Sequence, residues 1–255
     1  LVKVRGTINM WKESEQLKID RIRPVKEDDA VDMSAFVPTA PIAGEVLFDE
    51  LYRCAEGFRN NDIRMLTQYI LRENKEKLVK YPAALKLHHA MRGGLLYHTR
   101  TMLQAAKALC DVYEPIYPNL NRDLVYAGIM LHDVAKVEEL TVGELGLANG
   151  YSMSGQLLGH IAMGVGMLAR AAAELMVDEK QTVLLQHILL SHHDTAEHGS
   201  PKPPMFPEAE IVSQIDLLDS RLYEMYDALS SVAQGEFSER QWALDNRQLY
   251  KHGLE

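Results

Sequence analysis

Apolar positions recur with two different periods along this chain. In the segments 2–10 and 17–23 they alternate with polar residues, as in β-strands with one apolar face, and a polar turn at 11–15 separates the two. The apolar members are Val2, Val4, Ile8, Leu17, Ile19 and Ile22. Two strands cannot form a stable domain alone. The hairpin is therefore either an appendage packed on the helices or the last part of a truncated β-domain. Because Leu1 already stands inside the first strand, we expect truncation.

From residue 44 onward the apolar positions follow the period of an α-helix. The predicted helices span 44–58, 61–73, 95–113, 122–139, 155–176, 179–192 and 207–230, with a short one at 238–245. Glycines within 141–152 predict a small hairpin or lid. Residues 26–43 contain an acidic cluster and two prolines and have little periodicity, so we expect a linker there. The predicted organisation is a β segment at 1–25, a linker at 26–43 and an all-α domain at 44–255.

Composition narrows the class of protein. The chain has 255 residues, 47% of them hydrophobic, which is enough for a packed core. A net charge of −9 argues against coating nucleic acid by bulk electrostatics, although bound cations can invert a local field. Only Cys54 and Cys110 are present, far apart, which argues against a thiolate zinc site and favours a reducing compartment. With no membrane-length apolar run and no signal peptide pattern, we expect a cytoplasmic protein without membrane association.

Seven histidines and aspartates stand within otherwise apolar helical segments. They are His98, His132, Asp133, His160, His192, His193 and Asp216. Taken singly, each has a simple explanation, such as a core histidine, a helix cap or an ion pair. Buried imidazoles and carboxylates are costly unless something compensates them, so together they predict a shared metal centre. Asp219 competes with Asp216 for this role, and Lys136, one turn after His132, is predicted to project from the same helix face.

The donor types restrict the metal. Imidazole nitrogens and carboxylate oxygens suit manganese, iron, cobalt, nickel or zinc better than calcium. Seven ligands exceed the needs of one tetrahedral ion and predict two divalent ions bridged by a carboxylate. Such a pair activates a water and holds both oxygens of an in-line phosphoryl displacement.

The order of these residues is similar to a known pattern. His98, the doublet His132-Asp133 and Asp216 resemble the H…HD…D motif of the HD-domain metal-dependent phosphohydrolase superfamily. The flanking segments resemble the YhaM-like 3′-to-5′ exoribonucleases, which join an OB-fold to an HD domain. These segments are 88–90, 93–99, 120–124, 157–160, 191–193, 199–201, 207–210 and 244–247.

The resemblance implies a fold and a division of roles. It implies an HD-type helical bundle, with the N-terminal strands as the end of a truncated OB-fold. One metal would be held by His98, His132, Asp133 and Asp216, and the second by Asp133, His160, His192 and His193, with manganese the expected ion. Asp133 and Lys136 would be catalytic, with Lys136 at the scissile phosphate. Arg92 and Lys202, beside motif segments, are further candidates for phosphate contacts.

The predicted function is metal-dependent phosphodiester hydrolysis from the 3′ end of single-stranded RNA, with DNA left open, releasing nucleoside 5′-monophosphates. Three alternatives stay open. The chain could be a phosphohydrolase of small nucleotides or cyclic dinucleotides, a di-iron oxygenase, or a nucleic-acid-binding module with a structural metal. A homo-oligomer is also left open. The HD fold hosts several chemistries, so fold alone does not choose among them.

Overall fold

The computed structural model describes residues 1–12, 14–29, 31–32 and 35–254. The chain divides into two compact units, Leu1–Phe36 and Val37–Glu255. This boundary falls inside the predicted linker 26–43, of which residues 30, 33 and 34 lie outside the described residues.

Unit 1 contains the β-hairpin that the alternation predicts. β1 (Val2–Trp11) pairs antiparallel with β2 (Ser14–Pro24). Ile19 and Ile22 are three residues apart and would face opposite sides of a regular strand. A register shift leaves Asp20 without a paired residue, so that Ile22 lies opposite Val4 and Ile19 opposite Gly6. The bulge thereby keeps the apolar positions of both strands in one register.

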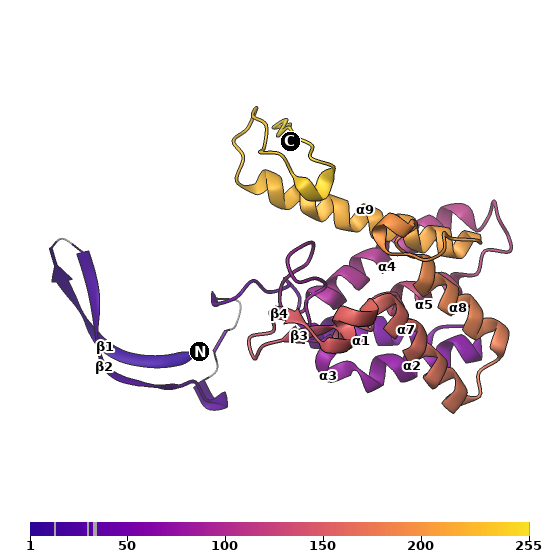
Figure 1. Ribbon diagram of the computed structural model, residues 1–255, viewed down its shortest axis with the longest axis horizontal. Helices are drawn as coiled ribbons and strands as arrows, with labels where there is room; N and C mark the ends of the chain where they lie inside the picture. The colour runs from indigo at the N-terminus through magenta and orange to yellow at the C-terminus, as the bar shows by residue number, and fades with distance from the viewer. Residues whose placement is uncertain (13, 30, 33–34, 255) are drawn as a thin grey trace. The chain divides into compact units, whose positions relative to one another are not determined.

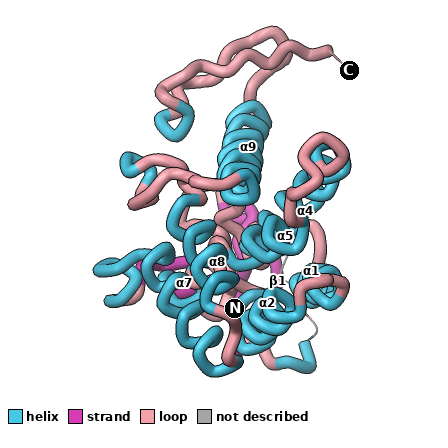
Figure 2. The backbone as a smooth tube through the Cα atoms, turned by 90° about the vertical axis from the view of Figure 1, so that its right-hand side faces the viewer, coloured by secondary structure: helices cyan, strands magenta, loops and turns pink. Residues whose placement is uncertain are grey.

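Unit 2 is helical, which confirms the all-α prediction for this part of the chain. Its α-helices are α1 (Gly44–Glu56), α2 (Asn61–Glu73), α3 (Lys75–Leu78), α4 (Gly94–Tyr113), α5 (Arg122–Leu131), α6 (Lys136–Glu139), α7 (Met153–Leu175), α8 (Glu179–Ser191) and α9 (Pro207–Ser230) (Figure 1). The predicted hairpin at 141–152 is present as β3 (Leu140–Val142) and β4 (Ala148–Tyr151), paired antiparallel. Helices make up most of the backbone tube in Figure 2.

Helix α5 is the centre of the bundle. Every residue from Leu124 to Leu131 is buried, because α5 packs against α1, α2, α4, α8 and α9. Its N-terminus is fixed by Asn121, whose side chain accepts a hydrogen bond from the backbone N–H of Leu124 at 3.1 Å. The C-terminal end of a helix held so firmly is a rigid place for functional side chains.

The C-terminal segment turns back beside α9 (Figures 1 and 2). Backbone bridges join Phe237 to Tyr250 and Gln241 to Arg247. The helix predicted at 238–245 is wrong, since only a single 3-10 turn, Trp242–Leu244, forms there. Among the described residues, none of the helices combines the length and the apolar character needed to cross a membrane.

Candidate metal centre

The His132-Asp133 doublet lies where α5 ends. The prediction of one continuous helix over 122–139 is wrong, because α5 stops at Leu131 and residues 132–135 form tight turns before α6. Nδ1 of His132 lies 2.8 Å from the carbonyl oxygen of Ile129, to which it donates. In a continuing helix that carbonyl would accept from the backbone N–H of Asp133. The imidazole therefore competes with the helix, and its Nε2 is left with a lone pair.

His192 ends α8 in the same way. Its Nδ1 donates to the carbonyl oxygen of Leu189 at 2.8 Å, and the helix stops at Ser191. The backbone N–H of the next residue, His193, donates to Oγ of buried Ser200 at 3.0 Å. The rings of His192 and His193 lie 4.1 Å apart between centroids, so both face the same region.

His160 is positioned by a break in α7 and by a carboxylate. Gly159 has φ 71° and ψ 160°, a conformation essentially restricted to glycine, and it interrupts the helical backbone. The break frees the backbone N–H of His160 to donate to Oε1 of Glu139 at 2.9 Å, while Nδ1 donates to the same oxygen at 3.1 Å. Nε2 of His160 is thereby left as a potential ligand atom.

His98, on α4, is completely buried between two carboxylates of α9. Its Nε2 lies 3.1 Å from Oδ1 of Asp216 and its Nδ1 lies 2.7 Å from Oδ2 of Asp219. Oδ2 of Asp219 also lies 2.9 Å from Nε2 of His89. Asp219 therefore touches the side of the ring away from Asp216, which makes it a positioning residue in this geometry rather than an alternative to Asp216.

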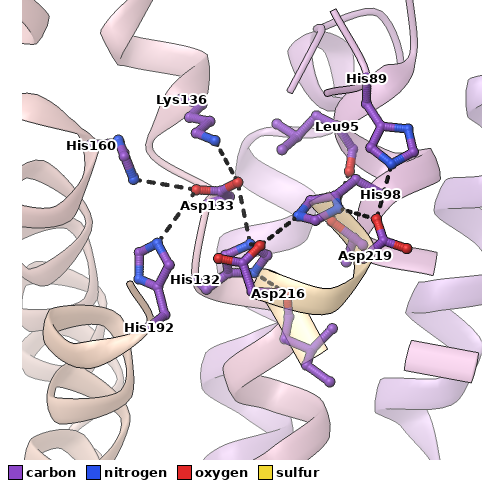
Figure 3. A network of polar contacts seen from close by, with 12 residues as sticks. His89, Leu95, His98, His132, Asp133, Lys136, His160, His192, Asp216 and Asp219 are labelled. Atoms are coloured by element: carbon purple, nitrogen blue, oxygen red, sulfur yellow. Dashed lines mark hydrogen bonds and ion pairs between the residues drawn. The ribbon is translucent and has the colours of Figure 1, made fainter. Parts of the chain in front are cut away.

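The carboxylate of Asp133 lies between Lys136 and three of the predicted histidine ligands (Figure 3). Its Oδ2 lies 3.2 Å from Nε2 of His132 and accepts from Nζ of Lys136 at 2.7 Å. Its Oδ1 lies 3.4 Å from Nε2 of His160 and 3.8 Å from Nε2 of His192. Lys136 thus pairs with Asp133 across the turn, and the expectation that it shares a helix face with His132 fails because no helix connects them.

Around Asp133, four buried atoms have no hydrogen-bond partner among the described residues. They are Oδ1 of Asp133 and Nε2 of His132, His160 and His192. Burying such groups unpaired costs free energy, and lone pairs that converge repel one another unless a cation lies between them. The potential ligand atoms of His98, His132 and Asp133 lie within 4.8 Å of one another, as do those of His160, His192 and His193. The donor set therefore fits a divalent metal ion.

The protonation states of Asp133 and His192 suit metal binding, whereas His98 must first lose a proton, because Asp216 and Asp219 outweigh its burial and raise its pKa to about 9. Burial opposes the charge of Asp133, but the ammonium of Lys136 outweighs it and holds the pKa of this carboxyl well below its usual range. Burial keeps the pKa of His192 well below its usual value, so the ring is neutral. Burial likewise disfavours the charge of Lys136, but Asp133 raises its pKa, and the side chain is a permanent ammonium. Anionic carboxylates and neutral imidazoles are the forms that ligate metals.

Comparison with known proteins agrees with this arrangement. The family model "HD domain" matches residues 95–221, which include all the clustered ligands. The chain is 43% identical to the 3′-5′ exoribonuclease YhaM of Bacillus subtilis (strain 168) over 251 residues, covering 98% of this chain and 78% of that protein. It is 45% identical to the YhaM protein of Geobacillus sp. (strain WCH70), covering 98% of this chain and 75% of the relative. The chain belongs to the YhaM family. No solved structure matches it significantly.

Two cavities border the centre of this YhaM-family chain. One, of about 380 Å³, reaches Lys136, His160 and His193. The other, of about 320 Å³, reaches Asp216, His192 and His193. Leu87 and His88 line both, so the cavities meet beside the centre. A larger cavity of about 520 Å³ lies around Arg122 and is lined by none of the predicted ligands.

The structure brings together all seven predicted ligands and Lys136, but not the two other predicted phosphate contacts. Arg92 lies with its side chain against Gly146, and its carbonyl oxygen accepts from the backbone N–H of Ala40 at 2.9 Å. Lys202 is exposed in the segment before α9. Neither lines the two cavities at the centre, and their roles stay predictions.

Three residues of the centre were not expected as site residues. Glu139 positions His160, His89 contacts Asp219, and His88 lines both cavities. The doublet His88-His89 before a pair of glycines was a usable signal in the sequence, as it repeats the pairing seen at His192-His193. Nothing in the sequence distinguished Glu139 from its neighbour Glu138.

Proposed function

We propose that this chain is a metal-dependent 3′-to-5′ exoribonuclease that removes nucleoside 5′-monophosphates from single-stranded RNA. The observation that carries the proposal is the convergence of four buried, unpartnered donor atoms around Asp133, beside two open cavities. The choice of RNA and of the 3′ end is supported by the YhaM relatives, which are named 3′-5′ exoribonucleases.

We propose that the centre binds two divalent metal ions. His98, His132, Asp133 and Asp216 would hold the first, and Asp133, His160, His192 and His193 the second. Nitrogen and oxygen donors without thiolate suit manganese, iron, cobalt, nickel or zinc, and manganese is the ion we propose. Such ions, when bound, acidify a water and neutralise negative charge on phosphate oxygens.

The residues of the chain supply the remaining chemistry. The ammonium of Lys136 is buried, lines the 380 Å³ cavity and is held 2.7 Å from Oδ2 of Asp133. It is placed to stabilise charge that develops on the non-bridging phosphate oxygens. In the hydrolysis, a bond forms between water oxygen and phosphorus, the bond between phosphorus and the 3′-oxygen breaks, and a proton from the water goes to that oxygen. The products are a nucleoside 5′-monophosphate and a shortened RNA with a 3′-hydroxyl.

The test uses 5′-labelled single-stranded RNA with the full chain and manganese. Wild type is expected to give a ladder that shortens from the 3′ end, and His132→Ala and Asp133→Ala are expected to give none. A DNA of the same sequence, run in parallel, tests whether the sugar is distinguished. His187→Ala is a matched control, because His187 lies on α8 but outside the centre, where its Nε2 accepts from the backbone N–H of Met205 at 3.0 Å.

Two results would contradict the proposal. Internal cleavage without a ladder would make the chain an endonuclease. Intact RNA, from protein shown by elemental analysis to carry two metals per chain, would leave the metal centre standing and reject RNA as its substrate. Hydrolysis of small nucleotides or uptake of oxygen by the same sample would then identify the alternative.

A further inference from the structure

The 380 Å³ cavity is lined in part by aromatic side chains that do not belong to the metal centre. Lys136, His160 and His193 of the centre line it, and it is also lined by buried Leu140 and by the exposed aromatic residues Tyr151 and Trp242. Tyr151 comes from β4 and Trp242 from the C-terminal segment, so two parts of the chain far apart in sequence supply these aromatic side chains. Its volume is within the range of about 300–1,000 Å³ that is usual for small-ligand sites.

Trp242 is an exposed aromatic on a well-anchored turn. Its side chain is 73% exposed, whereas Leu244 in the same turn is 1% exposed. The backbone N–H of Gln241 donates to the carbonyl oxygen of Arg247 at 2.9 Å, and that of Arg247 donates to the carbonyl oxygen of Leu244 at 3.1 Å. A loop closed by these bonds presents the indole in a defined place. Tyr151, 47% exposed, is likewise held, because it pairs with Leu140 in the hairpin.

The charge of this cavity suits a phosphate-bearing ligand. Lys86 and Lys136 both line it, although the chain as a whole carries a net charge of −9. Glu139, the acidic residue that lines it, already accepts hydrogen bonds from His160. The 320 Å³ cavity differs, since Asp194, Asp216, Glu224 and Asp245 line it with a single arginine, Arg221. A cavity with aromatic walls and two lysines favours a flat base attached to a phosphate.

We propose that this cavity is the site for the 3′-terminal nucleoside of the substrate, with its base stacked on Trp242 and Tyr151. The inference rests on the proposed function, because it is the phosphate of the terminal nucleotide that would lie at the metal centre beside Lys136. Stacking accepts any base, since every base has a π-face. The subsite therefore explains how the chain binds each new 3′-terminal nucleotide regardless of its base.

Fluorescence tests the site independently of hydrolysis. The chain has two tryptophans, Trp11 and Trp242, so Trp11→Phe leaves Trp242 as the only indole. Without added metal, adenosine 5′-monophosphate is expected to quench this emission with saturation, and ribose 5-phosphate is not. Equal quenching by both, or quenching by neither, would overturn the stacking proposal whether or not the chain degrades RNA.

Kinetics test the same contact during turnover. Replacing the 3′-terminal nucleotide by an abasic one is expected to raise KM by roughly 5- to 150-fold in wild type, the range for loss of one stacked base. In Trp242→Ala that discrimination should shrink, and Trp242→Phe should restore most of it. Tyr226→Ala is the matched control, since Tyr226 is 83% exposed on α9 and lines neither cavity.

The outcomes separate the two proposals. If RNA is degraded from its 3′ end and the abasic substrate is handled as well as the natural one, the stacking site is wrong and the function stands. If adenosine 5′-monophosphate quenches Trp242 but RNA stays intact, the site binds nucleotides and the exonuclease assignment fails.

Discussion

Nζ of Lys136 lies 2.7 Å from Oδ2 of Asp133, and this contact leaves Oδ1 of the same carboxylate facing His160 and His192 without a hydrogen-bond partner among the described residues. One oxygen of the carboxylate thus binds the ammonium of Lys136, and the other faces the histidines of the centre. The contact leaves Oδ1 of Asp133 available to a metal ion and places the ammonium of Lys136 beside the 380 Å³ cavity.

Lys136→Met should therefore act on turnover more than on folding. We expect kcat on single-stranded RNA to fall roughly 100- to 1,000-fold, the cost of removing one preorganised group that stabilises transition-state charge. Metal content, measured by elemental analysis, should persist because no ligand is lost. Lys180→Met, at an exposed position of α8, is the control and should turn over as wild type does. A Lys136→Met variant with undiminished kcat would remove Lys136 from the catalytic machinery.

Metal removal should destabilise the helical unit. At a metal concentration of 100 Kd the native state gains about 2.7 kcal/mol, which for a domain of this size corresponds to a Tm increase of roughly 5–10 °C. The physical reason is that metal relieves the repulsion among the buried lone pairs around Asp133. Differential scanning fluorimetry with and without chelator measures the shift. His132→Ala and His192→Ala should lose it, His187→Ala should keep it, and an equal Tm for both forms of the wild type would contradict the assignment.

Metal binding should depend on pH through His98. Burial opposes its charge, but the carboxylates of Asp216 and Asp219 prevail and raise the pKa of His98 to about 9. At pH 7.5 the metal-free ring is thus protonated, and a metal must displace the proton on Nε2. Affinity should rise as pH increases toward 9, and binding at pH 7.5 should release about one proton from this ring.

Calorimetry in buffers of different ionisation enthalpy counts the released protons. Asp219→Asn removes one of the two charges that raise the pKa of His98, so fewer protons should be released at pH 7.5 than in wild type. A proton count unchanged by this substitution would show that the proton comes from another group.

Glu139→Gln should weaken the second metal site selectively. The carboxylate fixes the ring of His160 through two hydrogen bonds to one oxygen, and loss of such a partner typically costs about 10- to 100-fold in metal affinity. At limiting metal, elemental analysis should find the stoichiometry falling from two toward one per chain. Glu138→Gln, at the exposed neighbouring position, is the matched control. Equal loss of both metals would mean that Glu139 supports the whole fold rather than His160.

The seven predicted ligands could be read from the sequence because each is a polar residue in an apolar helical pattern, and such residues need a common partner. Periodicity could not reveal how they meet. The turn after Leu131 forms because the His132 side chain donates a hydrogen bond to the carbonyl oxygen of Ile129. The apolar pattern of 122–139 gives no sign of this side-chain hydrogen bond. The partnership of Asp219 with His89 and His98 links positions more than a hundred residues apart, and no local signal carries it.

Gly159→Ala tests whether the break in α7 is part of the site. With φ 71° and ψ 160°, this position is essentially restricted to glycine, and a side chain there should cost roughly 1–3 kcal/mol or drive the backbone toward a regular helix. Either response moves the backbone N–H of His160 away from Glu139, so the second metal should bind more weakly while His98, His132 and Asp216 keep the first. Gly166→Ala, farther along α7 where a methyl group would meet only the end of the Arg170 side chain at 3.4 Å, is the control and should raise stability by about 0.5–1 kcal/mol. Unaltered binding of two metals by Gly159→Ala would show that His160 does not need the break to reach the centre.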